Sequence, residues 1–287
     1  MANLRTWRRE GRPAPHKPLL LLMLLARAQR AGSPVVPYAE VDGGLAHLLQ
    51  EFGPPRKSDH PEYPFWHLES DKVWLVRERA SIPLRSQAAN PSRAILLAHG
   101  VEGEVPAPLW QLLVEDPEFR DELAGRILRD FWPETLHDSL RRKVGLLLPG
   151  GTRETVTRAR RDARFRVAVL DAFAGACAVC GYDARLADDS MGVEAAHIRW
   201  HCCGGPDDLA NALALCALHH VALDSGALGI DSRHRVRISA HLAGGDRAQA
   251  LLHAFAGAPL LLAAQAPRPA PEHLRWHSRE VFRSPAA

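Results

Sequence analysis

Residues 193–224 read VEAAHIRWHCCGGPDDLANALALCALHHVALD, and this stretch decides the fold of the second half of the chain. It begins with the short β-prone run VEAAHI and continues through a turn rich in Gly, Pro and Asp. Its end, ALALCALHHVALD, has the spacing of a helix. We therefore expect a strand, a turn, a second strand or loop, and a helix. His197 lies on the strand, Asn211 follows the turn and His220 lies on the helix.

All five cysteines lie between residues 177 and 216, which favours a metal site in a reducing cytoplasm over a secreted disulfide scaffold. CAVC and CALH each contain two metal-binding side chains with two residues between them, and 35 residues separate the two pairs. Two such pairs can close a tetrahedral zinc site. The predicted zinc ligands are Cys177, Cys180, Cys216 and His219. The other cysteines, Cys202 and Cys203, lie in a Gly-rich loop and are expected to be bystanders.

The pieces CAVCG, EAAHI, GGPDDLANALALCALHH and LDSGAL resemble the zinc-stapled HNH endonucleases over about residues 165–235. The resemblance implies a ββα-metal arrangement in which His197 is the general base that deprotonates water. It also implies that Asn211 orients the strand of the base, and that His220 is a ligand of a catalytic Mg²⁺ or Mn²⁺. Asp224 lies four residues beyond His220, on the same face of a continuing helix, and is a second ligand or a partner of one.

The position before the base departs from the family pattern. Many HNH enzymes have a metal-ligating Asp there, whereas this chain has Ala196. Glu194 is close by, but on an ideal strand it faces away from His197. The sequence therefore leaves the ligand shell of the catalytic ion open. It also leaves open an exchange of roles between His219 and His220, although the two-residue spacing favours His219 on zinc.

The first half of the chain reads as a mostly helical module. The apolar run over about 18–31 predicts a buried helix, because Pro is favoured in a first turn and Gly follows the run. A second helix is predicted over 38–52 from its apolar spacing. Two aromatic and β-branched runs, 63–68 and 73–76, flank a four-residue polar turn and predict a β-hairpin. Helix, helix and hairpin outline a winged-helix-like domain, and residues 80–140 read as further helices.

Three pieces of this half resemble the DNA sulfur-binding domain that precedes HNH domains: APHKPLLLL at 14–22, FGP at 52–54 and YPFWHL at 63–68. That family recognises phosphorothioate DNA, in which sulfur replaces a non-bridging phosphate oxygen. An apolar pocket fits sulfur, because a phosphate oxygen would lose more hydration there. From the residues alone, the aromatic side chains at 63–68 also read as hairpin core. The resemblance implies DNA and sulfur contacts by His16, Lys17, Tyr63, Pro64 and His67, with Arg85 or Arg93 as a further basic residue.

The length fits one large or two ordinary domains, and the composition is that of a globular chain. Of 287 residues, 46% are hydrophobic and 24% charged, which excludes a fibrous or mainly disordered protein. The net charge of +3 does not by itself indicate nucleic-acid binding. PGGT at 149–152 is the best linker, followed by a basic helix with six Arg at 153–166. We expect an α+β chain with a sulfur-binding domain over 1–148 and an HNH domain over 149–287.

Together the two resemblances imply a modification-dependent restriction endonuclease that binds phosphorothioated DNA and hydrolyses phosphodiester bonds nearby. Two alternatives remain, namely an HNH nuclease directed to methylated bases and a zinc-stabilised DNA-binding protein without catalysis. The longest apolar run is too short to cross a membrane, and we expect the protein in a prokaryotic cytoplasm without a membrane partner. Cutting both strands with one site needs a homodimer or two successive visits, and the sequence does not decide between them.

Overall fold

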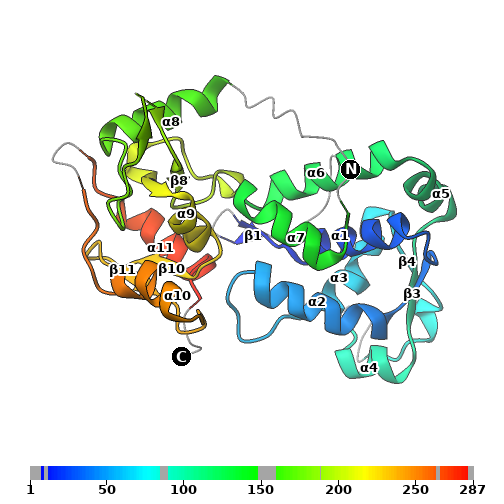
Figure 1. Ribbon diagram of the computed structural model, residues 1–287. Helices are drawn as coiled ribbons and strands as arrows, with labels where there is room; N and C mark the ends of the chain where they lie inside the picture. The colour runs from blue at the N-terminus through cyan, green and yellow to red at the C-terminus, as the bar shows by residue number, and fades with distance from the viewer. Residues whose placement is uncertain are drawn as a thin grey trace. The chain divides into compact units, whose positions relative to one another are not determined.

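The computed structural model describes residues 8–9, 12–84, 90–147, 160–187, 189–262 and 266–283. Helices and short sheets are both present, which confirms the expected α+β class (Figure 1). The chain divides into two compact units. Unit 1 consists of residues 1–9, 13–131 and 137–152, and unit 2 of residues 10–12, 132–136 and 153–287. The predicted linker at 149–152 lies outside the described residues.

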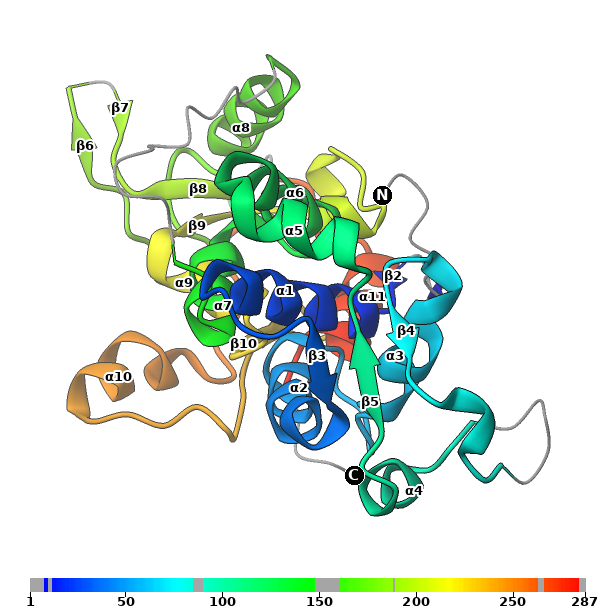
Figure 2. The same ribbon diagram turned by 90° about the vertical axis from the view of Figure 1, so that its right-hand side faces the viewer.

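Helix α1 (His16–Gln29) forms the centre of unit 1. Leu19, Leu20 and Leu22 are fully buried, and a helix that is apolar on every side needs neighbours all round. Figure 2 shows α1 surrounded by the other helices of the unit. Pro18 stands in its first turn, as the sequence predicted. The helices packed against α1 are α2 (Tyr38–Phe52), α3 (Glu62–His67), α5 (Ala107–Glu115), α6 (Pro117–Phe131) and α7 (His137–Val144).

A small antiparallel sheet with the strand order β3-β5-β4 completes unit 1. Its strands are β3 (Val35–Pro37), β4 (Leu75–Val76) and β5 (Glu102–Glu104). Val36 and Val76 both pair with Gly103 of the central strand. A Cβ atom at position 103 would lie 1.8 Å from the ring of the fully buried Trp74, so only glycine fits there. Between residues 80 and 140 the helical expectation holds for α4 (Arg93–Ala98), α5, α6 and α7 and fails at β5.

The β-hairpin expected from the runs 63–68 and 73–76 is wrong. The first run forms helix α3 and a following 3₁₀ turn, and in the second run only β4 is a strand, paired with β5. Tyr63 and His67 are exposed, whereas the three residues between them are buried. Two exposed residues four positions apart, with only buried residues between them, fit one face of a helix. Before the structure is known, a run of six residues is too short for its hydrophobic pattern to distinguish a helix from a strand. The winged-helix outline depended on this hairpin and stays a prediction.

Unit 2 is built on the antiparallel ribbon of β8 (Val193–His197) and β9 (Ala212–Cys216), with His197 opposite Ala212. Helix α9 (Ala217–Asp224) follows at once and completes the expected ββα unit. The first five residues of ALALCALHHVALD are strand and not helix, because all of them pair with β8. The other elements of unit 2 are α8 (Arg160–Ala172), β6 (Arg185–Leu186), β7 (Asp189–Ser190), β10 (Leu228–Ile230), β11 (Val236–Ile238), α10 (Asp246–Leu251) and α11 (Pro271–Glu280). Two short strands near the start of the chain, β1 (Arg8–Arg9) and β2 (Arg12–Pro13), pair with each other.

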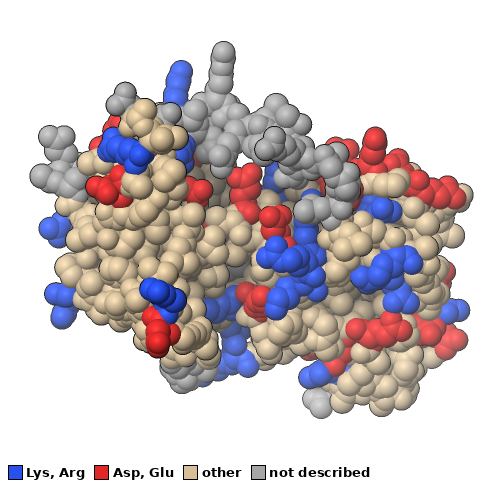
Figure 3. Space-filling view, in the orientation of Figure 1, with Lys and Arg blue, Asp and Glu red and all other residues tan. Residues whose placement is uncertain are grey.

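Charged side chains of both signs are interspersed on the face drawn in Figure 3. Blue side chains gather over the region of α7, whose last turn carries Arg141, Arg142 and Lys143. Lys143 forms an ion pair of 2.9 Å with Glu51, so part of this charge is balanced locally. The predicted basic helix at 153–166 begins at α8 in the described part of the chain. Among the described residues, no helix combines the length and the apolar character needed to cross a membrane.

Candidate functional site

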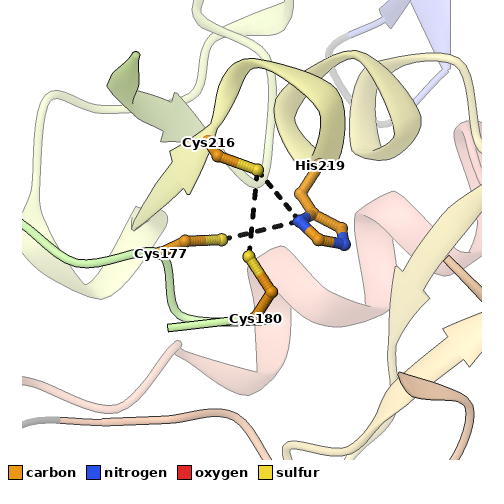
Figure 4. A group of neighbouring side chains, drawn as sticks. All are labelled: Cys177, Cys180, Cys216 and His219. Atoms are coloured by element: carbon orange, nitrogen blue, oxygen red, sulfur yellow. Dashed lines mark hydrogen bonds between the residues drawn. The ribbon is translucent and has the colours of Figure 1, made fainter. Parts of the chain in front are cut away.

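Three cysteines and a histidine of unit 2 point toward one another (Figure 4). Their ligand atoms all lie within 4.8 Å of one another. Cys216 Sγ is 3.0 Å from His219 Nδ1 and 4.0 Å from Cys180 Sγ, and Cys177 Sγ is 3.6 Å from the same nitrogen. Cys216 precedes the first residue of α9, so one strand end and one helix start supply half of the cluster. Three sulfurs and one imidazole nitrogen are a donor set that could hold zinc.

The donor atoms of this cluster are arranged as metal ligands. His219 directs Nδ1 at the sulfurs, and its buried Nε2 has no hydrogen-bond partner among the described residues. Hydrogen bonding with Cys216 lowers the pKa of Cys177 despite its burial, whereas burial raises the pKa of Cys180 and the hydrogen bond with Cys177 raises that of Cys216. The thiolate is the form of cysteine that binds metals. The Sγ atoms of Cys202 and Cys203 are 3.9 Å apart, and neither residue is among the four clustered side chains.

His197 ends strand β8 and stacks on α8. The ring centroids of His197 and Phe165 are 4.2 Å apart, with 14° between the ring planes. His197 Nε2 is 2.9 Å from Asp207 Oδ1, and the ring of His201 is 5.8 Å away. Burial lowers the pKa of His197, and the hydrogen bond with Asp207 opposes this without cancelling it. The imidazole is therefore neutral near pH 7, the form that can accept a proton.

The fully buried side chain of Asn211 closes the loop between β8 and β9. Its Oδ1 accepts from the backbone N–H of Arg199 at 2.8 Å, and its Nδ2 donates to the carbonyls of Arg199 and Pro206, both at 3.0 Å. A Cβ atom on Gly205 would lie only 1.9 Å from the Arg199 carbonyl oxygen, so the loop can close this tightly only with glycine. Asn211 therefore fixes the backbone that follows His197.

His220 lies between two carboxylates. Its Nδ1 is 2.7 Å from Glu194 Oε2, and its Nε2 is 3.3 Å from Asp224 Oδ2. Burial lowers the pKa of His220, but the neighbouring carboxylates of Asp224 and Glu194 outweigh it and raise the pKa to about 9. Sequence reasoning placed Asp224 beside His220 and left Glu194 without a role. Strand alternation places Glu194 on the face of β8 opposite His197, and α9 packs against β8. This alternation was therefore a usable signal for a contact between Glu194 and α9.

Asp224 is a buried junction of hydrogen bonds. Only 2% of the residue is exposed. Its Oδ1 accepts from Trp200 Nε1 at 3.0 Å, and its Oδ2 accepts from Thr135 Oγ1 at 2.5 Å. Thr135 belongs to the segment 132–136 of unit 2. No sequence signal could have found this contact, because 89 residues separate its two members.

The predicted DNA-contact residues His16 and Lys17 form the start of α1, the helix that packs against α3. His16 Nε2 is 3.0 Å from the carbonyl oxygen of Asp59, and burial lowers the pKa of this histidine. Lys17 Nζ is 2.5 Å from Asp71 Oδ2, and only 12% of its side chain is exposed. Neighbouring acceptors therefore hold both basic side chains.

Tyr63 is the exposed aromatic residue of α3, with 39% of its surface accessible. Its ring stacks on His60 with 4.6 Å between the centroids and 3° between the planes. The backbone of His60 has φ 50°, a left-handed conformation that only supporting contacts make acceptable for histidine. The His60 nitrogens meet Ser58 Oγ at 2.8 Å and Glu62 Oε1 at 2.9 Å. Sequence reasoning missed His60, which carries no motif.

The other predicted sulfur-site residues differ in their exposure. His67 lies one turn after Tyr63 on the exposed face of α3, with Nε2 2.8 Å from Asn90 Oδ1. Burial lowers the pKa of His67, and the charge of Lys17 lowers it further. Pro64 is buried. The structure thus brings His16, Lys17, Tyr63 and His67 to α1 and α3.

Of the two candidates for the additional basic residue, the structure describes Arg93. Arg93 Nη2 lies 2.5 Å from Oδ2 of the buried Asp42, whose other oxygen accepts from the Tyr38 hydroxyl at 3.0 Å. The hydrogen bond and the charge of Asp42 raise the pKa of Arg93. Arg93 is therefore engaged in an ion pair within unit 1. Arg85 lies outside the described residues.

Two family models match the chain. Residues 1–148 match the model of the ScoMcrA-like DNA sulfur-binding domain. Residues 177–231 match a model of HNH endonucleases. No curated protein matches the chain.

Several solved structures are similar to parts of it. The sulfur-binding domain of ScoMcrA complexed with phosphorothioated DNA is 25% identical, with a TM-score of 0.46 over 50% of this chain and 92% of that one. The type IV phosphorothioation-dependent restriction endonuclease ScoMcrA is 24% identical, with a TM-score of 0.42 over 50% of this chain and 30% of that one. The modification-dependent TagI restriction endonuclease is 28% identical, with a TM-score of 0.33 over 42% of this chain and 38% of that one. This chain spans less than half the length of either endonuclease.

Proposed function

Since the chain belongs to the family of ScoMcrA-like DNA sulfur-binding domains over residues 1–148 and carries an HNH endonuclease domain over residues 177–231, we propose that it is a modification-dependent restriction endonuclease. In this proposal the sulfur-binding domain at 1–148 binds phosphorothioated DNA, and the nuclease domain at 149–287 hydrolyses phosphodiester bonds nearby. Tethering the nuclease to the modified site raises its local concentration without sequence recognition at the cut.

The observation that carries the nuclease proposal is the neutral, partly buried imidazole of His197 on a ribbon that Asn211 holds closed. Asp207 accepts a hydrogen bond from Nε2 of His197, which leaves the lone pair on Nδ1 to take a proton from the attacking water. Asn211 keeps this strand end in place by fixing the backbone of Arg199. His197 is therefore the general base, and Asn211 is a positioning residue.

The donors beside His197 fit a hard divalent cation, Mg²⁺ or Mn²⁺. Asp224 Oδ2 and His220 Nε2 are 3.3 Å apart on one face of α9 and offer one oxygen and one nitrogen. A bound cation supplies positive charge that stabilises the phosphorane and the leaving oxygen. Trp200 and Thr135 hold the carboxylate of Asp224 in the orientation that such a ligand needs.

A structural Zn²⁺ is the proposed occupant of the other metal site, held by Cys177, Cys180, Cys216 and Nδ1 of His219. Four protein donors close the coordination shell of zinc. In this proposal the ion links the turn that carries Cys177 and Cys180 to the start of α9 and takes no part in the chemistry. Reduced cysteines are required, which agrees with a prokaryotic cytoplasmic location.

For unit 1, the exposed face of α3 supports a sulfur-recognition site. Tyr63 and His67 present a ring face and a neutral imidazole on one side of the helix, and His16 and Lys17 lie at the adjacent start of α1. A weakly hydrated sulfur tolerates contact with such rings better than a phosphate oxygen does. Pro64 is the buried residue that follows Tyr63 in α3. The additional basic residue is Arg85 or Arg93, and 56% of the Arg93 side chain stays exposed beside its ion pair with Asp42.

A paired cleavage assay tests the proposal. One plasmid, prepared with and without phosphorothioation, is incubated with the protein and Mg²⁺ or Mn²⁺ beside the His197→Ala variant. We expect wild-type protein to cut only the modified plasmid and the variant to bind it without cutting. Cutting of both plasmids would remove the sulfur-recognition proposal and keep the nuclease. Retained cutting by His197→Ala would remove the assignment of the base. Sedimentation with and without DNA distinguishes a homodimer from two successive visits.

A further inference from the structure

The imidazole of His220 has different relations to its two carboxylates. The 2.7 Å separation of Nδ1 and Glu194 Oε2 is that of a strong hydrogen bond between an imidazole N–H and a carboxylate. The 3.3 Å separation of Nε2 and Asp224 Oδ2 is longer than an ordinary N–H···O hydrogen bond. The carboxylates therefore occupy opposite nitrogens of one ring and are not equivalent.

The longer separation suits two ligands of one ion. Two donors at about 2.1 Å from a Mg²⁺, at right angles to each other, are about 3 Å apart. Nε2 of His220 and Oδ2 of Asp224 come close to that spacing and lie on successive turns of α9. Asp224 is held by Trp200 and Thr135, so the direction of this donor is fixed within the protein.

From this arrangement we propose that Glu194 is a positioning residue that keeps the proton of His220 on Nδ1 and thereby leaves the lone pair of Nε2 to the catalytic ion beside Asp224. The proposal rests on the proposed nuclease function. A neutral imidazole has one N–H and one lone pair, so a carboxylate that accepts from Nδ1–H determines which nitrogen is the ligand. The same hydrogen bond sets the rotation of the ring about its Cβ–Cγ bond.

Glu194 itself is placed to act through His220. It lies three residues before His197, so strand alternation directs it to the other face of β8. It contacts the nitrogen that points away from Asp224. The position before the base is Ala196, which has no donor atom. With a ligand absent there, the ion depends more on the correct tautomer of His220.

The test measures ion binding as well as cleavage. Wild-type protein with its zinc retained is titrated with Mn²⁺ by electron paramagnetic resonance, beside Glu194→Ala, Glu194→Gln and the control Asp246→Ala. Asp246 is an exposed acid at the start of α10 in the same unit. We expect Glu194→Ala to bind Mn²⁺ about 10- to 100-fold more weakly, the usual effect of losing such a partner. Glu194→Gln should stay within a few-fold of wild type, because its amide oxygen also accepts from Nδ1–H. Asp246→Ala should bind as wild type does.

A second readout separates positioning from a general structural role. Nitrogen NMR of histidine-labelled protein, recorded with saturating diamagnetic Mg²⁺ because the pKa of His220 is raised to about 9 in the absence of an ion, reports which nitrogen of His220 carries the proton, with His220→Gln used for assignment. We expect the Nδ1–H form in wild type and Glu194→Gln, and a mixed or Nε2–H form in Glu194→Ala. Unchanged Mn²⁺ affinity and tautomer in Glu194→Ala would overturn the proposal. If His220→Gln also leaves Mn²⁺ binding unchanged, the ion site itself is misplaced and the proposed nuclease site fails first.

Discussion

The ring of Phe165 lies nearly parallel to the imidazole of His197, with 4.2 Å between the centroids and 14° between the planes. Phe165 belongs to α8, so a helix outside the ββα unit covers one face of the imidazole of the candidate base. Burial is the main cause of the lowered pKa of His197, and this ring contributes to the burial. The stacking contact therefore links the packing of unit 2 to the pH at which the base works.

Replacing this ring should move the pH dependence of cleavage. A general base is active when neutral, so the rate falls as the pH drops through the pKa of His197. The wild-type pKa lies below the ordinary value of 6.5, and Phe165→Leu should raise it toward 6.5 because the ring is less well buried. The acid limb of the pH–rate profile should shift upward by up to the same amount. Phe173→Leu, a change at another buried Phe of unit 2, should lower stability without moving the limb.

Asn211→Ala should lower stability and cleavage and leave the binding of modified DNA intact. The substitution leaves the N–H of Arg199 and two carbonyls without their partner, and each such group costs about 1–3 kcal/mol. We expect urea unfolding to show a loss of at least about 2 kcal/mol. Cleavage should fall strongly, while binding of modified DNA persists. Asn211→Asp keeps the acceptor for Arg199 N–H and should be intermediate. Equal stability of Asn211→Ala and wild type would contradict the role of this side chain.

Zinc content should depend on Cys180 and not on Cys202. Both are partly buried cysteines of unit 2, but only Cys180 belongs to the four-residue cluster. We expect Cys180→Ser to lose the metal and to unfold several degrees lower, because a structural zinc contributes to folding. Cys202→Ser should keep both properties. Atomic absorption and thermal unfolding measure them, and zinc loss in the Cys202 variant would move the ligand set to the Gly-rich loop.

Tyr63→Ala should weaken binding of phosphorothioated DNA more than binding of unmodified DNA. The ring is exposed on α3 and offers an apolar face to sulfur. Losing one such aromatic contact costs about 1–3 kcal/mol, or about 5- to 150-fold in affinity for the modified duplex. Tyr182→Ala is the matched control, because Tyr182 is equally exposed but belongs to unit 2. Fluorescence anisotropy on paired duplexes gives both affinities, and equal losses on both duplexes would argue against a sulfur site at Tyr63.

His60→Gly should lower the preference for modified DNA, with a modest loss of stability because Ser58 and the buried Glu62 lose their contacts with the imidazole. Glycine accepts the left-handed backbone of His60 at φ 50° at no steric cost, so the loop should keep its course. The parallel stack on Tyr63 is lost, and the Tyr63 ring becomes free to rotate. We expect a few-fold drop in the affinity ratio between modified and plain duplexes. An unchanged ratio would show that Tyr63 needs no support from His60.

Most of the nuclease half followed from local patterns. The strand at 193–197, the helix that carries His220 and the cysteine pairs depend on spacing within a few residues, which the sequence states directly. The sequence also indicated α1 and α2, because long apolar runs with helical spacing have few alternatives. It failed at 63–68, where six residues with two aromatic side chains fit either period.

The sequence by itself determined the central helices α1 and α2, the strand that carries His197, the Cys/His spacing of the candidate zinc cluster and the family. Only the tertiary structure decided which side chains surround the candidate catalytic residues. Thr135 reaches Asp224 across 89 residues, Phe165 covers His197 from a separate helix, and Glu194 meets His220 because α9 packs on that face of β8. Residue spacing specifies contacts within a strand or a helix. Contacts between elements depend on how their buried faces pack, and no local pattern encodes that.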